Sequence, residues 1–188
     1  MAFIKTISEA DATGTLTDLY TKVGNGDGTV DNVMKIHSLN EAALAGHFEV
    51  YVAAMHRPSP LSRIMREIVG VIVSRLNGCD YCQRHHAAGL DRLARHDRAG
   101  LGDALLAGEY SGLSQKERAM AAYATTLTQS PEAINAADIQ ALRDAGLDDR
   151  EIHDLAHVVA YFCYANRIVT GLGVALEGGG IGQHSSVS

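Results

Sequence analysis

The feature that most limits how this chain can fold is the repeated pairing of a helix-start signal with apolar residues three or four positions apart. Ser114-x-x-Glu117 and Asp148-x-x-Glu151 each place a capping side chain three residues before a glutamate, a pattern that satisfies the free amide groups at a helix N-terminus. Asn135 can cap a further helix in the same way. No run of alternating polar and apolar residues is long enough to indicate a strand. The sequence therefore predicts an all-α fold.

The first half of the chain has the same helical periodicity. Apolar residues recur at three- and four-residue steps over 40–55, which predicts an amphipathic helix. We expect Ser59 to cap the next helix, which runs over about 60–76 with a proline in its first turn. Asn77 and Gly78 then break the helical pattern. A new helix is predicted to begin directly after them.

Two cysteines and a histidine occupy the start of this new helix. Cys79, Cys82 and His86 fall at roughly 0°, 300° and 340° around a helix, so they share a face about 60° wide. Free amide groups and the positive end of the helix dipole lower the pKa of a thiol placed there. Three interpretations are open: a catalytic dithiol, half of a zinc site, or two buried small side chains. Zinc needs a fourth ligand that the motif does not supply, so the spacing favours the dithiol.

Three further side chains extend the chemistry of this motif. His86 follows Cys82 by four residues, the spacing at which helix side chains stack, so its imidazole is placed to accept a thiol proton. Glu67 lies among apolar residues, and a contact with His86 would satisfy a buried carboxylate; the exposed edge of its helix is the alternative. Tyr81, between the cysteines, either donates a hydrogen bond to bound substrate or packs.

Composition narrows the class of protein. The chain has 188 residues, 46% hydrophobic and 20% charged, which suits one compact soluble domain. A formal charge of -6 without a cluster of lysine and arginine argues against a nucleic-acid or membrane-surface partner. The longest aliphatic run, over 68–73, is too short to span a bilayer, and no apolar leader is present, so we expect a cytoplasmic protein. In that reducing compartment, three cysteines indicate a catalytic or metal-binding role rather than structural disulfides.

The sequence also contains a candidate internal repeat. Four positions match at one constant offset: Arg66 with Arg150, Glu67 with Glu151, Ile68 with Ile152, and Cys79 with Cys163. Chance is the alternative, because the matching window is short. Asn166 stands in the second copy where the first has Cys82. Thr170 stands there in place of His86, so dithiol chemistry is available only to the first copy.

Glu67, Cys79-x-x-Cys82 and His86 together resemble the core motif of AhpD-like alkylhydroperoxidases, within the carboxymuconolactone decarboxylase superfamily. Similarity to the peroxidase-related branch extends to further segments: Arg66-Glu67, Val73-Ser74, Asn77-Gly78-Cys79, Asn166-Arg167-Ile168 and Gly171-Leu172-Gly173. The resemblance covers about 59–174. It implies an all-helical AhpD-like fold without a metal or flavin cofactor, and subunits that assemble into trimers or hexamers.

The resemblance also implies a role for each residue of the motif. Cys82 corresponds to the peroxidatic cysteine, Cys79 to the resolving cysteine, His86 to the base, and Glu67 to the end of the proton relay. The implied activity is reduction of alkyl hydroperoxides, with the disulfide reset by an external dithiol or a thioredoxin-like reductant. One position differs, since the best-studied members carry a second histidine where this chain has Tyr81. A decarboxylase-type enzyme and a redox-switched or zinc-bound interaction protein are the alternative functions.

We expect a single domain over 1–188, with N-terminal helices in 1–58, a core in 59–174 and a tail in 175–188. Paired alanines along the helices allow close helix approach, and few large aromatic side chains are present. Flat helical faces of this kind need a partner to cover them, which predicts a homo-oligomer. The family resemblance indicates a trimer or hexamer, and a dimer stays open.

Overall fold

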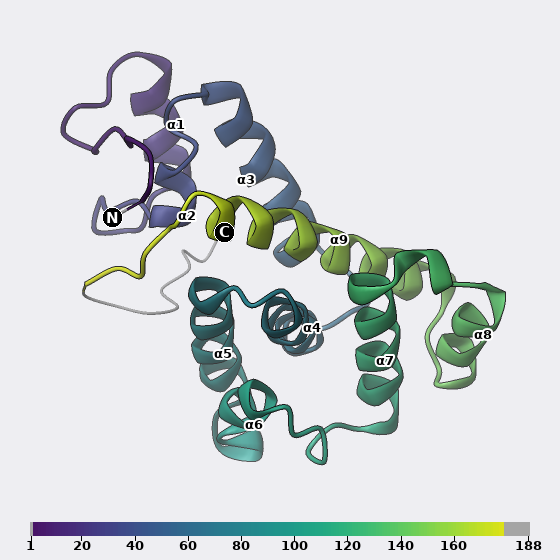
Figure 1. Cartoon of the computed structure of the whole chain (residues 1–188). Helices are drawn as coiled ribbons and strands as arrows, with labels where there is room; N and C mark the ends of the chain where they lie inside the picture. Colours follow the sequence, from purple (N-terminus) through teal and green to yellow (C-terminus); the bar gives the residue numbers. More distant parts are fainter. Residues whose placement is uncertain (1, 179–188) are drawn as a thin grey trace.

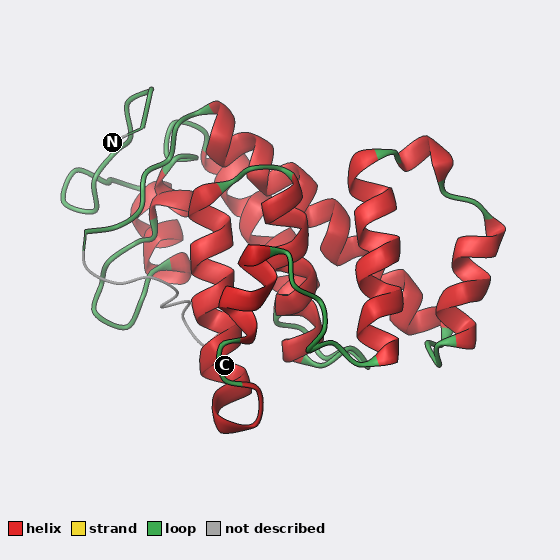
Figure 2. Ribbon diagram, turned by 60° about the horizontal axis from the view of Figure 1, so that its bottom comes forward, coloured by secondary structure: helices red, strands yellow, loops and turns green. Residues whose placement is uncertain are grey.

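The computed structural model describes residues 2–178, except the side chain of His96, and all regular structure in this part of the chain is helical (Figure 1, Figure 2). The α-helices are α1 (Thr15–Val23), α2 (Asn32–Lys35), α3 (Glu41–Met55), α4 (Arg63–Leu76), α5 (Asp80–Ala94), α6 (Leu101–Ala107), α7 (Gln115–Gln129), α8 (Ala136–Asp144) and α9 (Asp149–Gly171). Two 3₁₀ turns, η1 (Arg95–Arg98) and η2 (Pro131–Ala133), connect them. The predicted all-α fold is confirmed. Within this part of the chain no helix combines the length and apolar character needed to cross a membrane.

Most of the predicted helix starts are confirmed. Capping boxes begin α7, α8 and α9 at Ser114, Asn135 and Asp148. The expected Ser59 cap is wrong, because Ser62 caps α4 by accepting a hydrogen bond from the backbone of the third helical residue. Ser59 instead donates to Asp154 at 2.6 Å. The fully buried Leu61 follows Ser59, so the chain first turns into the core before the helix begins.

Helix α4 lies at the centre of the molecule and packs against α5, α7 and α9 (Figure 1). Its middle, over 66–74, is buried on all sides, as expected of a helix enclosed by neighbours. A methyl group at Gly70 would lie 2.5 Å from the ring of Phe162 in α9. Glycine therefore allows α9 to approach closely enough for Phe162 to reach the cysteine site.

The connection between α4 and α5 places the first cysteine. Gly78 has φ +66, a left-handed conformation that glycine adopts at no steric cost. The chain turns there, and Cys79 becomes the N-cap residue of α5, with its amide donating to the Ser74 carbonyl at 3.0 Å. Asn77 donates to the side chain of Asn166 at 3.0 Å, which joins this break to α9.

The described part of the predicted tail packs against the rest of the chain. The segment after α9 turns back along α2 and the N-terminal residues (Figure 1). Phe3 donates its backbone amide to the Leu172 carbonyl at 2.8 Å, and the Asn32 side chain donates to the Ala175 carbonyl at 3.0 Å. Residues 179–188 of the expected tail lie outside the described residues. The domain boundaries over 1–58, 59–174 and 175–188 stay a prediction.

Candidate active site

The two cysteines of the motif lie side by side at the start of α5. Cys79 and Cys82 are free thiols and are almost fully buried. Their sulfur atoms are 2.9 Å apart, within hydrogen-bonding distance. A hydrogen bond from the Cys82 thiol lowers the pKa of Cys79 to about 7. The same contact, together with burial, raises the pKa of Cys82. The pair is therefore ready to lose one proton near neutral pH and to retain the other.

A buried histidine and a buried carboxylate form the second part of the site. His86 Nδ1 lies 2.6 Å from Glu67 Oε2, and both side chains are less than 10% exposed. This is the contact expected from the sequence, and it joins α5 to α4. The Arg63 guanidinium lies 3.7 Å from the other oxygen of Glu67. A carboxylate in this position holds the imidazole in one orientation and stabilises its protonated form. The role of the pair in proton transfer stays a prediction.

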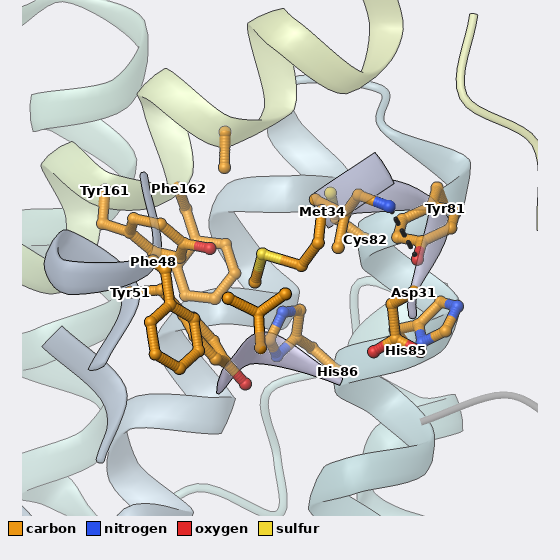
Figure 3. Close-up of a pocket in the computed structure, with 13 residues that line it drawn as sticks. Asp31, Met34, Phe48, Tyr51, Tyr81, Cys82, His85, His86, Tyr161 and Phe162 are labelled. Carbon is orange, nitrogen blue, oxygen red and sulfur yellow. Dashed lines mark hydrogen bonds between the residues drawn. The ribbon is translucent and has the colours of Figure 1, made fainter. Parts of the chain in front are cut away.

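Cys82 and His86 line one small, partly enclosed cavity of about 30 Å³ (Figure 3), which is room for one or two water-sized molecules. Its remaining walls come from the end of α1, the loop before α2, and α2, α3, α5 and α9. They are largely apolar or aromatic: Val23, Asp31, Val33, Met34, Phe48, Tyr51, Tyr81, His85, Tyr161, Phe162 and Ala165. The ring of His86 packs edge-on against Phe162, with centroids 4.6 Å apart. Cys79 is absent from this lining. Of the two cysteines, only Cys82 therefore lines this cavity.

Glu177 adds a second carboxylate to the site, from beyond the last helix. It accepts hydrogen bonds from the Tyr81 hydroxyl and the Asn32 amide, each at 2.7 Å, and lies 2.8 Å from His85 Nε2. Burial alone would raise the pKa of Glu177, but the hydrogen bonds from His85, Tyr81 and Asn32 outweigh it and lower the pKa to about 2. Glu177 is therefore ionised at neutral pH and fixes Tyr81 and His85, whose rings stack at 4.3 Å.

The structure brings four of the five predicted site residues together and places the fifth, Tyr81, beside them. Cys79, Cys82, His86 and Glu67 form one cluster, and Tyr81 lies beside it with its hydroxyl engaged by the carboxylate of the C-terminal segment. A role for Tyr81 in binding substrate stays a prediction. The sequence analysis missed Glu177, because no local pattern links a residue after the last helix to partners so far away along the chain.

Helix α9 contributes two polar side chains to the dithiol. Hydrogen bonds from Thr170 and Asn166 lower the pKa of Cys79, and Asn166 also lowers that of Cys82. Asn166 is held in place by a 3.1 Å hydrogen bond to Ser74. The repeat offset could have identified both residues, since it aligns them with Cys82 and His86.

The described residues contain no group of three or more His, Cys, Asp or Glu side chains arranged to hold a metal ion. The zinc interpretation of Cys79 and Cys82 thus lacks a ligand set in this part of the chain. Structural zinc sites use four such ligands in tetrahedral geometry.

A buried dithiol at a helix start, beside a buried imidazole–carboxylate pair in an all-helical fold, defines the class of AhpD-like proteins. The sequence model of the carboxymuconolactone decarboxylase family matches residues 42–98 and again residues 94–177, so the chain belongs to this family. The first match contains α4 and α5, and the second contains α9. The origin of the candidate repeat by duplication stays a prediction.

Solved structures with the same fold include two peroxidase-related proteins and a debrominase. An uncharacterized peroxidase-related protein from Silicibacter sp. TM1040 is 29% identical, with a TM-score of 0.82 over 92% of this chain and 90% of that one. A peroxidase-related protein from Ralstonia eutropha JMP134, described as an alkylhydroperoxidase AhpD core, is 23% identical, with a TM-score of 0.85 over 94% and 93%. The debrominase Bmp8 is 17% identical, with a TM-score of 0.75 over 92% and 91%. No curated protein matches the chain.

Proposed function

We propose that this protein reduces hydroperoxides through the Cys79–Cys82 dithiol. The observation that carries the proposal is the partly enclosed cavity in which Cys82 and the Glu67-bound His86 face the same small space. A peroxide group needs little room, and the apolar walls suit its alkyl part. The fold shared with peroxidase-related proteins supports the same reaction class.

The first half of the proposed reaction oxidises Cys82. The dithiol loses one proton to His86, and Glu67 stabilises the imidazolium that forms. The remaining proton crosses from Cys82 to Cys79 over the 2.9 Å between the sulfurs. Cys82 then attacks the terminal peroxide oxygen, so an S–O bond forms and the O–O bond breaks. The leaving alkoxide takes the proton from His86, which yields an alcohol and a sulfenic acid on Cys82.

The second half closes a disulfide and then reopens it. The Cys79 sulfur displaces hydroxide from the Cys82 sulfenic acid, and the proton of the Cys79 thiol converts this hydroxide to water. The pKa of Cys79, near 7, makes its thiolate available for this step at neutral pH. An external dithiol, free or on a thioredoxin-like protein, then returns two electrons to the pair by exchange.

Stopped-flow oxidation of the reduced protein tests this function. Hydrogen peroxide, a short alkyl hydroperoxide and a small disulfide are compared at equal concentration, with loss of free thiols as the readout. A hydroperoxide should react fastest, and mass spectrometry should find an intramolecular Cys79–Cys82 disulfide. Faster oxidation by the disulfide would assign the protein to thiol–disulfide exchange instead. Inertness toward all three would favour the decarboxylase-type or interaction-protein alternatives.

Reductive debromination is a second candidate, because aromatic rings surround Cys82: Phe48, Tyr51, Tyr161 and Phe162. In that reaction the Cys82 thiolate would take bromine from an aromatic carbon, which gains a proton. Cys79 would then displace bromide to form the same disulfide. A variant of the debrominase Bmp8, with the same fold, binds 2,3,4-tribromopyrrole. Release of bromide from this compound by the reduced protein is the discriminating measurement.

We further propose that the working unit is a cytoplasmic homo-oligomer. Val50 of α3 and Tyr164 of α9 are large, more than 40% exposed and line one shallow hollow, which a second copy would cover. Light scattering behind size exclusion tests this state. A mass near one 20.0 kDa chain at micromolar concentration would contradict it.

A further inference from the structure

The cavity beside Cys82 contains a tyrosine hydroxyl that has no part in the reaction described above. Tyr161 of α9 is 5% exposed and lines this cavity together with Cys82 and His86. Figure 3 shows its hydroxyl directed inward among the lining side chains. Burial, and to a smaller extent the charges of Tyr51 and Cys82, raise the pKa of Tyr161, so the hydroxyl keeps its proton at neutral pH. The hydroxyl is therefore available as a hydrogen-bond donor to a molecule in the cavity.

A buried histidine lies next to this hydroxyl, outside the cavity. His47 of α3 is 2% exposed, and its Nε2 atom lies 3.5 Å from the hydroxyl oxygen of Tyr161. That distance is at the long limit for a hydrogen bond, so an oxygen atom in the cavity can compete for the hydroxyl proton. Burial, together with the charge of His37, lowers the pKa of His47 to about 3. The imidazole of His47 is therefore neutral at neutral pH and carries one proton.

The surroundings of His47 leave this proton free to occupy Nε2. Nδ1 of His47 and Nε2 of His37 have no hydrogen-bond partner in the described part of the chain, and the two rings lie 4.5 Å apart. When the proton is on Nε2, His47 donates it to the Tyr161 oxygen, and Tyr161 donates its own proton into the cavity. Buried polar atoms without partners cost stability and are uncommon. Two of them beside a reactive cavity therefore indicate a function rather than packing.

We propose that Tyr161 is a catalytic residue, which donates a hydrogen bond to the oxygen that leaves when Cys82 attacks a hydroperoxide, and that His47 is the positioning residue that directs this hydroxyl. The inference rests on the proposed function. As the O–O bond breaks, its electron pair stays on the alkoxide oxygen. The hydrogen bond from Tyr161 stabilises this charge until His86 supplies the proton. Tyr161 keeps its own proton throughout, so the reaction needs no further oxidant or reductant.

Two oxidants of similar size separate this role from packing. Ethyl hydroperoxide releases ethoxide, a strong base that needs stabilisation, whereas peroxyacetic acid releases acetate, a weak base that does not. Stopped-flow thiol oxidation compares the parent chain with Tyr161→Phe and Tyr164→Phe, after circular dichroism has shown that both variants are folded. Tyr164 is the matched control, because its ring also lies 5.7 Å from that of His47 but is 41% exposed and absent from the cavity lining.

We expect Tyr161→Phe to slow oxidation by ethyl hydroperoxide by about 10²-fold, the usual cost of removing one donor to a developing oxyanion. Oxidation by peroxyacetic acid should slow much less. Tyr164→Phe should react with both oxidants at the parent rate. A parent-like rate of folded Tyr161→Phe with ethyl hydroperoxide, or equal slowing with both oxidants, overturns the role of Tyr161. The same selective slowing in Tyr164→Phe overturns it too.

Two substitutions of His47 test the positioning role. His47→Leu removes the donor and should also slow oxidation by ethyl hydroperoxide selectively. His47→Gln places an amide nitrogen near the position of Nε2 and should restore the rate. Equal slowing with both oxidants in His47→Leu, or no recovery in His47→Gln, overturns the role of His47.

The parent chain shows which proposal fails. A parent that reacts with neither oxidant, although diamide still forms its disulfide, contradicts the proposed function and the role of Tyr161 with it. A reactive parent beside an equally reactive Tyr161→Phe contradicts only the role of Tyr161.

Discussion

The two copies of the repeat use similar residues to make very different structures. In the first copy, the Asn77-Gly78 break divides the unit into α4 and α5, and Cys79 becomes an N-cap residue. In the second copy, α9 runs unbroken from Asp149 to Gly171, and Cys163 lies inside it. Amide groups inside a helix are already paired, so only the first cysteine lies beside free donors. The break in the helix, rather than the cysteine itself, distinguishes the reactive copy.

The two glutamates of the repeat differ in the same way. Glu151 lies in the first turn of α9, where it completes a capping box with Asp148 and pairs with Lys116 at 2.6 Å. Glu67 lies deeper in its helix and contacts His86. The second copy thus uses its acid for stability, while the first directs its acid into the site.

The second copy also supports the first. Its α9 supplies Asn166 and Thr170 to the cysteines and Phe162 to the cavity. Neither segment of the candidate repeat therefore builds the site alone. Matched substitutions in the two copies can break or sharpen the comparison.

The largest expected effect is the difference in thiol oxidation rate between variants of Cys82 and of Cys163. Cys82→Ser should abolish oxidation by hydroperoxide, whereas Cys163→Ser should leave the rate unchanged, because the Cys163 sulfur contacts the side chains of Asn77 and Thr128 and does not line the cavity that Cys82 and His86 share. Stopped-flow thiol oxidation measures both rates.

A trapping experiment assigns the attacking sulfur within the pair. Cys79→Ser should leave Cys82 as a sulfenic acid after peroxide treatment, trapped by a dimedone-type probe. The pKa directions place the first negative charge on Cys79, whereas the cavity places Cys82 nearer the oxidant. Trapping on Cys79 in Cys82→Ser, with none in Cys79→Ser, would reverse the assignment.

The next largest expected effect is the difference in oxidation rate between variants of Glu67 and of Glu151. Glu67→Gln should slow thiol oxidation near neutral pH by a factor on the order of 10² to 10⁴, the usual contribution of a positioned base. The combination with His86→Asn should cost little more than either change alone, because the two side chains act as a unit. Glu151→Gln should lower stability through loss of the Lys116 contact and leave the oxidation rate unchanged. A parent-like rate in folded Glu67→Gln would refute the relay.

Local patterns predicted the features that depend on local physics. Capping boxes satisfy amide groups within four residues, so Ser114 and Asp148 were recognised directly. Helical spacing was sufficient to bring Cys82 and His86 to one cavity. The prediction that Ser59 caps α4 was wrong because Ser59 and Ser62 have the same capping chemistry. Burial of Leu61, which lies between them, selects the later helix start.

Contacts between distant segments were not predictable in this way. Glu177 reaches Tyr81 and His85 only because the chain turns back after α9. The aromatic cavity walls come from separate helices, and each such residue alone is typical of any core. Local sequence patterns therefore predict the reactive residues of the site, whereas the residues of its walls come together only through the fold.

The break in the first copy should carry a measurable strain. Gly78→Ala forces an alanine into a left-handed conformation, which should lower the free energy of unfolding by about 1–2 kcal/mol. No other atom lies within 4 Å of the added methyl group, so backbone strain is the sole expected cost. Gly171→Ala, at the end of α9, also meets open space and has no positive φ, and it should be neutral or slightly stabilising. Urea unfolding compares the two variants, and equal stability would contradict this account of the break.

The smallest expected effect concerns the hydroxyl that α9 directs at the dithiol. Thr170 donates a hydrogen bond that lowers the pKa of Cys79, so Thr170→Val should raise this pKa above about 7. The thiolate fraction at pH 7 then falls, and alkylation by iodoacetamide slows, with its pH midpoint shifted upward. Thr128 provides the matched control, because its hydroxyl lies 3.9 Å from Cys163. Thr128→Val should leave the midpoint of the dithiol unchanged. An unchanged midpoint in Thr170→Val, or equal shifts in both variants, would show that α9 supports the dithiol only by packing and not through this hydrogen bond.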